Sequence, residues 1–305
     1  MTTRTPLEVI SLSSGKGEKA ACRTLSGLLA TESMERRRLA REVETARQVQ
    51  ERLFPVATPV VAGLEHCGLW RPARGVSGDY LDYLDLPGGD FGLAIGDVAG
   101  KGLPAAILMS ALHGMIRALG FTRRGGLAYV VRKVNDLFFR VSPDNCFASL
   151  FLARYDPARQ RLHYINAGHE SPFLLRREKS GWRIAPFEPG GPVIGVLDGH
   201  SYREGIATLA PDDIVVAYTD GVSEMRNAAG EEWGSARLLR TVQEFSECSA
   251  EEIAARVLEE ADRFAGRAPQ QDDMTLWVAR VRREKQRAGF EATETMPETA
   301  EASAA

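Results

Sequence analysis

The spacing of apolar positions divides the chain into blocks of strands and blocks of helices. Short runs with alternating or continuous apolar residues predict strands, and apolar residues recurring every three or four positions predict helices. The predicted strands are 64–71, 79–86, 91–95, 147–155, 161–166, 172–176, 182–185, 214–218 and 274–281. The predicted helices are 103–116, 126–141, 235–245 and 250–264. Because strands and helix pairs come in blocks, the order predicts an α+β fold built of layers and not repeated βαβ units.

A helix of different composition precedes these blocks. From Leu28 to Phe54 the chain is rich in Glu, Arg, Ala and Gln, contains no Gly or Pro, and is closed by Pro55. A stripe with 4-3-4-3 spacing follows one side of it and consists of Leu39, Val43, Ala46, Gln50 and Leu53. The stripe covers about two heptads, which leaves two interpretations open: an amphipathic helix lying on its own domain, or a dimerising helix that carries a signal.

These patterns predict four segments. Residues 1–27 mix Thr, Ser, Gly and Lys without a period and are expected to be flexible or to fold with a partner. Residues 28–55 form a helical linker, and residues 56–283 form the main folded domain. Residues 284–305 are rich in Glu, Thr, Ala and Ser and are expected to be disordered.

Composition and charge exclude several classes of protein. The chain has 305 residues, of which 44% are hydrophobic, enough for one full core. Its 38 basic and 41 acidic residues are spread along the chain, without the basic patch that nucleic acid binding requires. No apolar run is long enough for a membrane span, and the 4 cysteines form no C-x-x-C pair. We therefore expect a cytoplasmic protein with free thiols, no nucleic acid partner and no membrane span.

Candidate chemistry lies in four aspartates, each beside the end of a predicted strand. They are Asp79, Asp97, Asp220 and Asp272. Strand ends from distant parts of a chain can meet at one cleft, and the glycines next to three of these aspartates allow a close approach. A lone Asp-Gly most often marks a turn, so the inference depends on all four together.

Carboxylates gathered in one cleft repel each other unless they hold protons or bind cations. Oxygen ligands without nearby Cys or clustered His favour magnesium or manganese over zinc. Two such ions about 3.5 to 4 Å apart activate a water and clamp a phosphoryl group. The four aspartates therefore favour hydrolysis of a phosphate ester.

Six short motifs resemble one family. They are Gln50–Pro55, Val76–Tyr80, Gly96–Gly102, Asn166–His169, Tyr218–Gly221 and Asp272–Thr275. In this order they resemble the motif series of the bacterial SpoIIE/RsbU branch of the PPM (protein phosphatase 2C-like) serine/threonine phosphatases. The resemblance covers residues 46–282. It implies a sandwich of two central antiparallel β-sheets flanked by helix pairs, with the phosphatase domain at residues 56–283.

The resemblance also implies a mechanism and its residues. Asp97 would bridge two Mn²⁺ or Mg²⁺ ions, with Asp79 and the Val98 carbonyl on one and with Asp220 and Asp272 on the other. A metal-bridging water would then attack the phosphorus of a phosphoserine or phosphothreonine. The family's substrates are phosphorylated anti-sigma-factor antagonists, which take part in the partner-switching control of a sigma factor in stress responses.

The resemblance assigns the helical linker a regulatory role as well. It would connect an upstream regulator acting on residues 1–55, or a homodimer formed through the linker, to the helix that follows Asp97. Two positions depart from the family pattern. Ser77 stands where a glycine is usual, so the turn at this position could differ from that of the family. Ala99 stands where the eukaryotic relatives have a histidine, so protonation of the leaving group would fall to a metal-bound water.

Several residues near the motifs have two interpretations each. Arg74 either binds the substrate phosphate or is a solvated surface arginine. Asp82, Gly221 and Asp273 either support the site or are turn residues. Three other residues are expected to take no part in catalysis. They are Lys101, a surface or cap residue, His169, a structural hydrogen-bonding residue, and His200, a turn residue.

Two other functions use the same residues. The first is a noncatalytic pseudophosphatase that binds a partner, but the presence of all four aspartates argues against it. The second is a phosphatase of small-molecule phosphate esters, which the motifs alone do not separate from a protein phosphatase.

Overall fold

The computed structural model describes residues 15–120 and 126–282. The helices are α1 (Gly15–Gln50), the short 3-10 helix η1 (Glu51–Leu53), α2 (Leu103–Gly120), α3 (Gly126–Val141), α4 (Asp220–Ser223), α5 (Ser235–Glu244) and α6 (Ala250–Ala265). The strands are β1 (Leu64–Arg71), β2 (Asp79–Asp85), β3 (Phe91–Val98), β4 (Ala148–Asp156), β5 (Arg161–Ala167), β6 (Phe173–Glu178), β7 (Gly181–Pro186), β8 (Gly205–Thr208), β9 (Ile214–Tyr218) and β10 (Met274–Val281).

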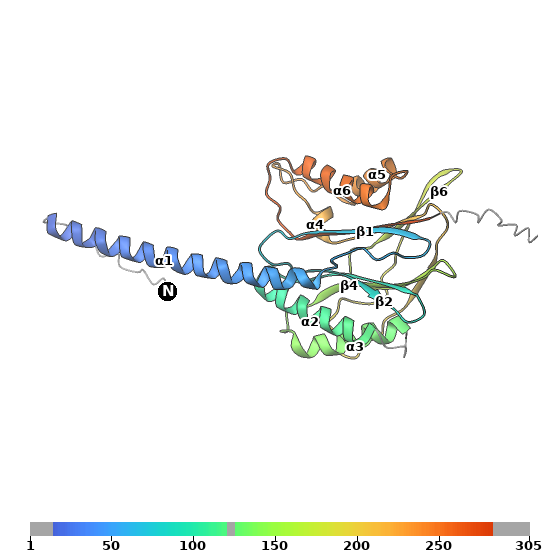
Figure 1. Cartoon of the computed structure of the whole chain (residues 1–305), viewed down its shortest axis with the longest axis horizontal. Coiled ribbons are helices and arrows are strands. Elements are labelled where there is room, and N and C mark those ends of the chain that lie inside the picture. Colours follow the sequence, from blue (N-terminus) through green and yellow to red (C-terminus); the bar gives the residue numbers. More distant parts are fainter. Residues whose placement is uncertain (1–14, 121–125, 283–305) are drawn as a thin grey trace, which may run out of the picture.

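Two antiparallel sheets lie face to face between two pairs of helices (Figure 1). One sheet has the strand order β1-β10-β9-β6-β7, and α6 packs on its outer face together with α5. The other has the order β2-β3-β4-β5-β8, and α2 and α3 cover its outer face. This arrangement confirms the α+β sandwich that the blocks of strands and helices and the family resemblance predict.

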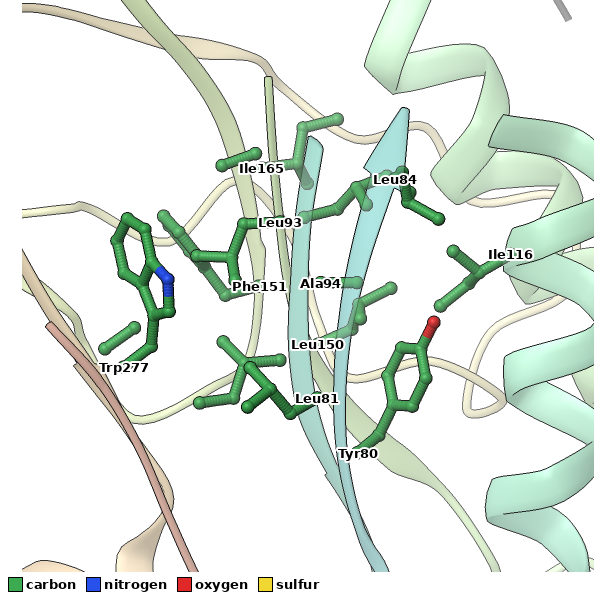
Figure 2. Packing of buried hydrophobic residues seen from close by; sticks show 14 of the residues in the cluster. Tyr80, Leu81, Leu84, Leu93, Ala94, Ile116, Leu150, Phe151, Ile165 and Trp277 are labelled. Atoms are coloured by element: carbon green, nitrogen blue, oxygen red, sulfur yellow. The ribbon is translucent and has the colours of Figure 1, made fainter. Parts of the chain in front are cut away.

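Alternation along β2 and β3 decides which side chains face the other sheet. Figure 2 shows Leu81 and Leu93 on the side of Trp277, a residue of β10 in the opposite sheet. It shows Tyr80 and Leu84 on the other side, toward Ile116 of α2. Because successive side chains of a strand point to opposite faces, Asp79 belongs to the side between the sheets and Asp82 to the side of α2.

Local sequence signals fix the ends of several elements. Ser249 and Glu252 form a capping box at the start of α6, in which each side chain binds the other residue's backbone N–H. Gly266, with a φ of +62°, ends the same helix. Between these ends, α6 packs against β1 and β10.

The helix α1 begins at Gly15, earlier than the predicted start at Leu28, and projects from the body of the molecule (Figure 1). Its predicted stripe is divided between two environments. Leu39 is exposed, whereas Gln50 is buried against the body. The C-terminal end of α1 therefore lies on its own domain, and the part that projects has no partner among the described residues. The functional division of the chain at residues 27, 55 and 283 stays a prediction, and residues 1–14 and 284–305 lie outside the described residues.

The structure corrects the predicted elements in three places. The linker helix ends at Gln50, and residues 51–53 form a 3-10 turn before Phe54. Strand β8 was not predicted, yet it pairs with β5 and forms an edge of its sheet. The short helix α4, also not predicted, begins at Asp220 directly after β9.

Among the described helices, α2 has the length and apolar composition that a membrane-spanning helix needs. Core helices of folded domains share both properties. In this structure α2 packs against β2 and β3, with Met109, Leu112 and Ile116 fully buried.

Candidate active site

Asp79 and Asp97 lie directly opposite each other at the adjoining ends of β2 and β3. The Asp79 side chain is buried, and its Oδ2 atom accepts hydrogen bonds from two hydroxyls, one on β10 of the opposite sheet and one directly after β9. Thr219 Oγ1 lies 2.8 Å away and Thr275 Oγ1 lies 2.6 Å away. The two threonines therefore hold the Asp79 carboxylate in place across the space between the sheets.

The backbone before Asp79 lies close to Asp97 and Val98. A Cβ atom on Gly78 would lie 3.1 Å from the Val98 carbonyl oxygen and 3.3 Å from Asp97 Oδ1. The Val98 N–H donates to the Gly78 carbonyl at 3.2 Å. The predicted ligand atoms of Asp97 and Val98 thus meet around Gly78, where a side chain would crowd them.

Ser77 fits its position without the glycine that the family usually has there. Its backbone is not in the left-handed region that glycine favours. Its hydroxyl oxygen accepts a hydrogen bond from the Asp79 N–H at 3.0 Å. The departure from the family motif therefore adds a local contact and does not strain the turn.

Asp220 is placed by a close backbone contact. It is the first residue of α4, and Gly221 follows it. A Cβ atom on Gly221 would lie 1.9 Å from the Asp273 carbonyl oxygen, a distance that no side chain tolerates. Gly221 therefore brings α4 against the segment of Asp272 and Asp273.

Asp273 joins two parts of the site through its carboxylate. It accepts the backbone N–H of Ala73 at 2.7 Å and that of Gly78 at 2.8 Å. These bonds fix the loop between β1 and β2, which contains Arg74. The Arg74 side chain is exposed on this loop.

Asp272 meets a cation from another part of the chain. Its Oδ2 atom lies 2.5 Å from the Lys101 ammonium, which also donates to the Gln271 carbonyl at 3.1 Å. Lys101 was expected to be a surface or cap residue, and its side chain is exposed. It also connects the loop after β3 to the segment before β10.

The carboxylates raise one another's pKa values. The pKa of Asp97 rises to about 8, first because of burial and then because of the nearby Asp220 and Asp272 carboxylates. Burial, with a smaller effect of Asp272, also raises the pKa of Asp220. The pKa of Asp79 is raised well above its usual range by burial and by Asp97, although its two threonine hydroxyls oppose the rise. The carboxylates of the site therefore resist becoming charged together in the absence of a cation.

The donor set fits a hard divalent cation. It consists of carboxylate oxygens and one backbone carbonyl, without Cys, and excess negative charge of this kind is relieved by a cation. Among the described residues, no three His, Cys, Asp or Glu side chains are yet close enough together to hold an ion. The carboxylates would have to close in around an ion, and Asp272 would have to give up its contact with Lys101.

Asp82 is the predicted site residue that the structure places elsewhere. It is fully buried on the side of α2, where Arg117 Nε lies 2.7 Å from its Oδ2 atom. The Tyr80 hydroxyl donates to the same oxygen at 3.0 Å. Asp82 therefore ties β2 to α2 and does not face the other aspartates.

Three residues that support the site had no assigned role at the sequence level. Thr219 and Thr275 lie inside the recognised motifs, so their positions were marked although their contact with Asp79 was not. Gln50 was assigned to the helical stripe, but its side chain makes a double hydrogen bond to the Ser77 backbone, with N–H and C=O each at 2.8 Å. No periodic signal distinguishes that contact from ordinary packing.

His169 has the hydrogen-bonding role that was expected of it, beside the strand position that pairs with Asp97. Its Nδ1 atom lies 2.9 Å from Ser149 Oγ, and Ser149 is the neighbour of Asp97 on β4. Its backbone N–H donates to the Asn166 side chain at 2.8 Å. The ring is buried, and burial lowers its pKa to about 4, so it is neutral at pH 7. His200, by contrast, lies in the turn region before β8.

Comparisons with known proteins agree with this geometry. The family model for Stage II sporulation protein E (SpoIIE) matches residues 87–282. The phosphoserine phosphatase RsbU of Bacillus subtilis is 29% identical over 191 residues, which cover 62% of this chain and 55% of that protein. The chain thus spans about half the length of this curated relative.

Solved structures share the fold. The RsbU and RsbW domains of Rv1364c from Mycobacterium tuberculosis match with a TM-score of 0.64 and 25% identity, over 75% of this chain and 63% of that one. The SiaA-PP2C domain of Pseudomonas aeruginosa matches with a TM-score of 0.68 and 22% identity, over 80% and 98%. The catalytic domain of the phosphatase PstP, solved with 2 manganese ions, matches with a TM-score of 0.53 and 17% identity, over 72% and 99%.

The family model covers more than half of the chain, and the motifs that carry the resemblance lie at the strand ends where the aspartates meet. The chain therefore belongs to the Stage II sporulation protein E (SpoIIE) family, a branch of the PPM (protein phosphatase 2C-like) serine/threonine phosphatases.

Proposed function

We propose that this chain hydrolyses phosphoserine or phosphothreonine on a protein substrate with the help of two Mn²⁺ or Mg²⁺ ions. The observation that carries the proposal is the meeting of Asp79 and Asp97 at adjoining strand ends. Asp220 and Asp272 lie close enough that burial and these two carboxylates raise the pKa of Asp97 to about 8. Such a cluster is costly for a fold to maintain without a cation. The manganese ions of the PstP catalytic domain, which has the same fold, support the choice of metal.

The chain's own residues divide the work between them. Asp79, Asp97, Asp220, Asp272 and the Val98 carbonyl would hold the ions, which when bound activate a water and neutralise charge on the phosphoryl group. Thr219 and Thr275 keep the Asp79 carboxylate fixed.

The substrate phosphate would meet the loop between β1 and β2. Asp273 holds this loop through the backbone N–H groups of Ala73 and Gly78. Arg74 lies between these two anchors with an exposed side chain. We assign it to the substrate phosphate, since a guanidinium binds phosphate oxygens with two parallel hydrogen bonds.

We further propose a phosphorylated anti-sigma-factor antagonist as the substrate, within the partner-switching control of a sigma factor. The similarity to RsbU, a phosphoserine phosphatase, supports this choice. It also favours a protein substrate over a small phosphate ester, because the identity extends over 191 residues and not over the aspartate motifs alone.

We also propose that α1 transmits a regulatory signal to the active site. Gln50, at the end of α1, holds the Ser77 backbone with two hydrogen bonds, two residues before Asp79. The projecting part of α1 exposes Leu28, Leu29, Met34 and Leu39. A regulator or a second copy of the chain that binds this exposed part would act on Asp79 through Gln50. If deletion of residues 1–45 changes neither oligomeric state nor turnover, the proposed regulation through α1 is wrong.

The substrate class is tested by comparing two substrates at equal concentration with Mn²⁺. One is a small folded protein carrying phosphoserine, and the other is p-nitrophenyl phosphate. We expect a value of kcat/KM at least about 100-fold higher for the phosphoprotein, because remote contacts contribute to transition-state binding. Equal values would point to a phosphatase of small esters. Absence of turnover with both substrates would point to a pseudophosphatase.

A further inference from the structure

Lys101 lies where the site needs a cation. Its ammonium is 2.5 Å from Asp272 Oδ2, and the contact joins positions 171 residues apart in the sequence. The second contact, to the Gln271 carbonyl at 3.1 Å, keeps the ammonium beside the same segment. A carboxylate oxygen predicted to bind metal is therefore occupied by a positive charge of the chain itself.

The charges of the site show what this contact does. Lys101 lowers the pKa values of Asp97 and Asp220, whereas Asp272 raises both. The ammonium therefore offsets part of the repulsion among the carboxylates, as a bound metal ion would. The Lys101 ammonium thus serves as a counter-ion of Asp272.

The contact is also easy to break. Both partners are partly exposed, with 45% of the Lys101 side chain and 38% of the Asp272 side chain accessible to solvent. Ion pairs this exposed contribute little to stability, so a divalent cation can displace the ammonium. The flanking Gly100 and Gly102 have φ angles of +106° and +75°, which allow the loop other conformations without cost to a side chain.

We propose that the Lys101 ammonium competes with a metal ion for Asp272, so that Lys101 must leave Asp272 when the site is loaded. The proposal rests on the proposed metal site and adds to it a regulating residue. Lys101 keeps the metal-free site compact and limits its affinity for metal. Lys101 lies on the loop between β3 and α2.

Metal affinity tests the proposal without reference to turnover. Mn²⁺ binding is measured by titration calorimetry on the full chain for wild type, Lys101→Gln and Lys101→Arg. We expect Lys101→Gln to bind Mn²⁺ about three- to tenfold more tightly, since an exposed ion pair no longer competes. Lys101→Arg keeps the charge and should bind as the wild type does. Lys133→Gln is the matched control, because Lys133 is similarly exposed and pairs with Asp136 on α3.

A second readout separates displacement from a general effect of charge. Acylation of individual lysines is followed by mass spectrometry in the wild-type chain with and without Mg²⁺. Displacement predicts that acylation of Lys101 rises several-fold when Mg²⁺ is added, while acylation of Lys133 stays constant.

Both results together support the proposal. Unchanged or weaker Mn²⁺ binding by Lys101→Gln, or unchanged acylation of Lys101, overturns it while leaving the proposed phosphatase function intact. If the wild type binds no Mn²⁺ at all, the proposed metal-dependent function fails together with this inference.

Discussion

Asp79 and Asp97 face each other across β2 and β3, yet the two carboxylates have different surroundings. Asp79 is tied to the opposite sheet by the hydroxyls of Thr219 and Thr275. Asp97 lies among other carboxylates, and these together with burial raise its pKa to about 8. One aspartate is thus fixed by hydrogen bonds, whereas the other depends on a cation for its charge.

This difference predicts that Asp97→Asn stabilises the metal-free protein. In the wild type the folded state keeps a proton on Asp97 between about pH 4 and pH 8, whereas the unfolded state loses it. The free energy of unfolding therefore falls as pH rises through this window. The uncharged amide of the Asp97→Asn variant does not titrate, so this decrease disappears. We expect the free energy of unfolding to be about 1–3 kcal/mol higher than in wild type at pH 8 in EDTA. Urea unfolding measures it, and a variant less stable than wild type at pH 8 would contradict the electrostatic account.

Gly221 should tolerate no side chain. Gly221→Ala would place a Cβ atom 1.9 Å from the Asp273 carbonyl oxygen, so α4 must move away and carry Asp220 with it. We expect a loss of about 2–4 kcal/mol of stability and at least about tenfold weaker Mn²⁺ binding.

Gly114→Ala is the control for this change. Gly114 lies in α2, and a Cβ atom there meets nothing within 4 Å. The same substitution should raise stability by about 0.5–1 kcal/mol, because alanine favours helix. Similar effects of the two substitutions in thermal unfolding would argue against a close contact at Gly221.

Gln50 should be more important than its neighbours on α1. Gln50→Leu leaves the buried Ser77 N–H and carbonyl without partners, which costs about 2–4 kcal/mol of stability. Because Ser77 precedes Asp79 closely, turnover should fall as well. Gln48→Leu is the matched control, since Gln48 is exposed and its side chain donates to Glu44 on the same helix. Urea unfolding and phosphate release of both variants test the difference, and equal values would remove Gln50 from the proposed regulation through α1.

His169 predicts a loss of stability in mild acid. Burial lowers its pKa from 6.5 to about 4, so the folded state binds fewer protons than the unfolded state between these values. Its contribution is complete above pH 6.5 and is lost as pH falls toward 4, by up to ~3 kcal/mol. In His169→Asn, stability should change less with pH in this range than in wild type. Parallel curves of unfolding free energy against pH would contradict a neutral buried histidine.

The four aspartates could be found in the sequence because each lies in a short motif at the end of a strand. The motifs show where each aspartate lies relative to a strand. Because strand ends can meet in a layered fold, the four could be assigned to one site: Asp79, Asp97, Asp220 and Asp272. The strands of the sandwich were found for a similar reason, because alternation and continuous apolar runs are local signals.

The features that the sequence did not predict depend on contacts between positions far apart in the chain. Strand β8 is only Gly205–Thr208, too short to establish a period of two. Asp79 and Asp82 lie three positions apart on one strand, so alternation puts them on opposite faces, but which face meets α2 depends on distant contacts. The contact of Lys101 with Asp272 and that of Gln50 with Ser77 join segments far apart in the chain, which no local pattern specifies.

The central claim is that the aspartate cluster hydrolyses a phosphoprotein through bound metal. Phosphate release from a phosphorylated antagonist protein, measured with Mn²⁺ and with EDTA, tests it most directly in wild type, Asp97→Ala and Asp220→Asn. We predict turnover for the wild type with Mn²⁺, none above background in EDTA, and a loss of at least about 100-fold in either variant. Equal phosphate release in all of these samples would contradict the account.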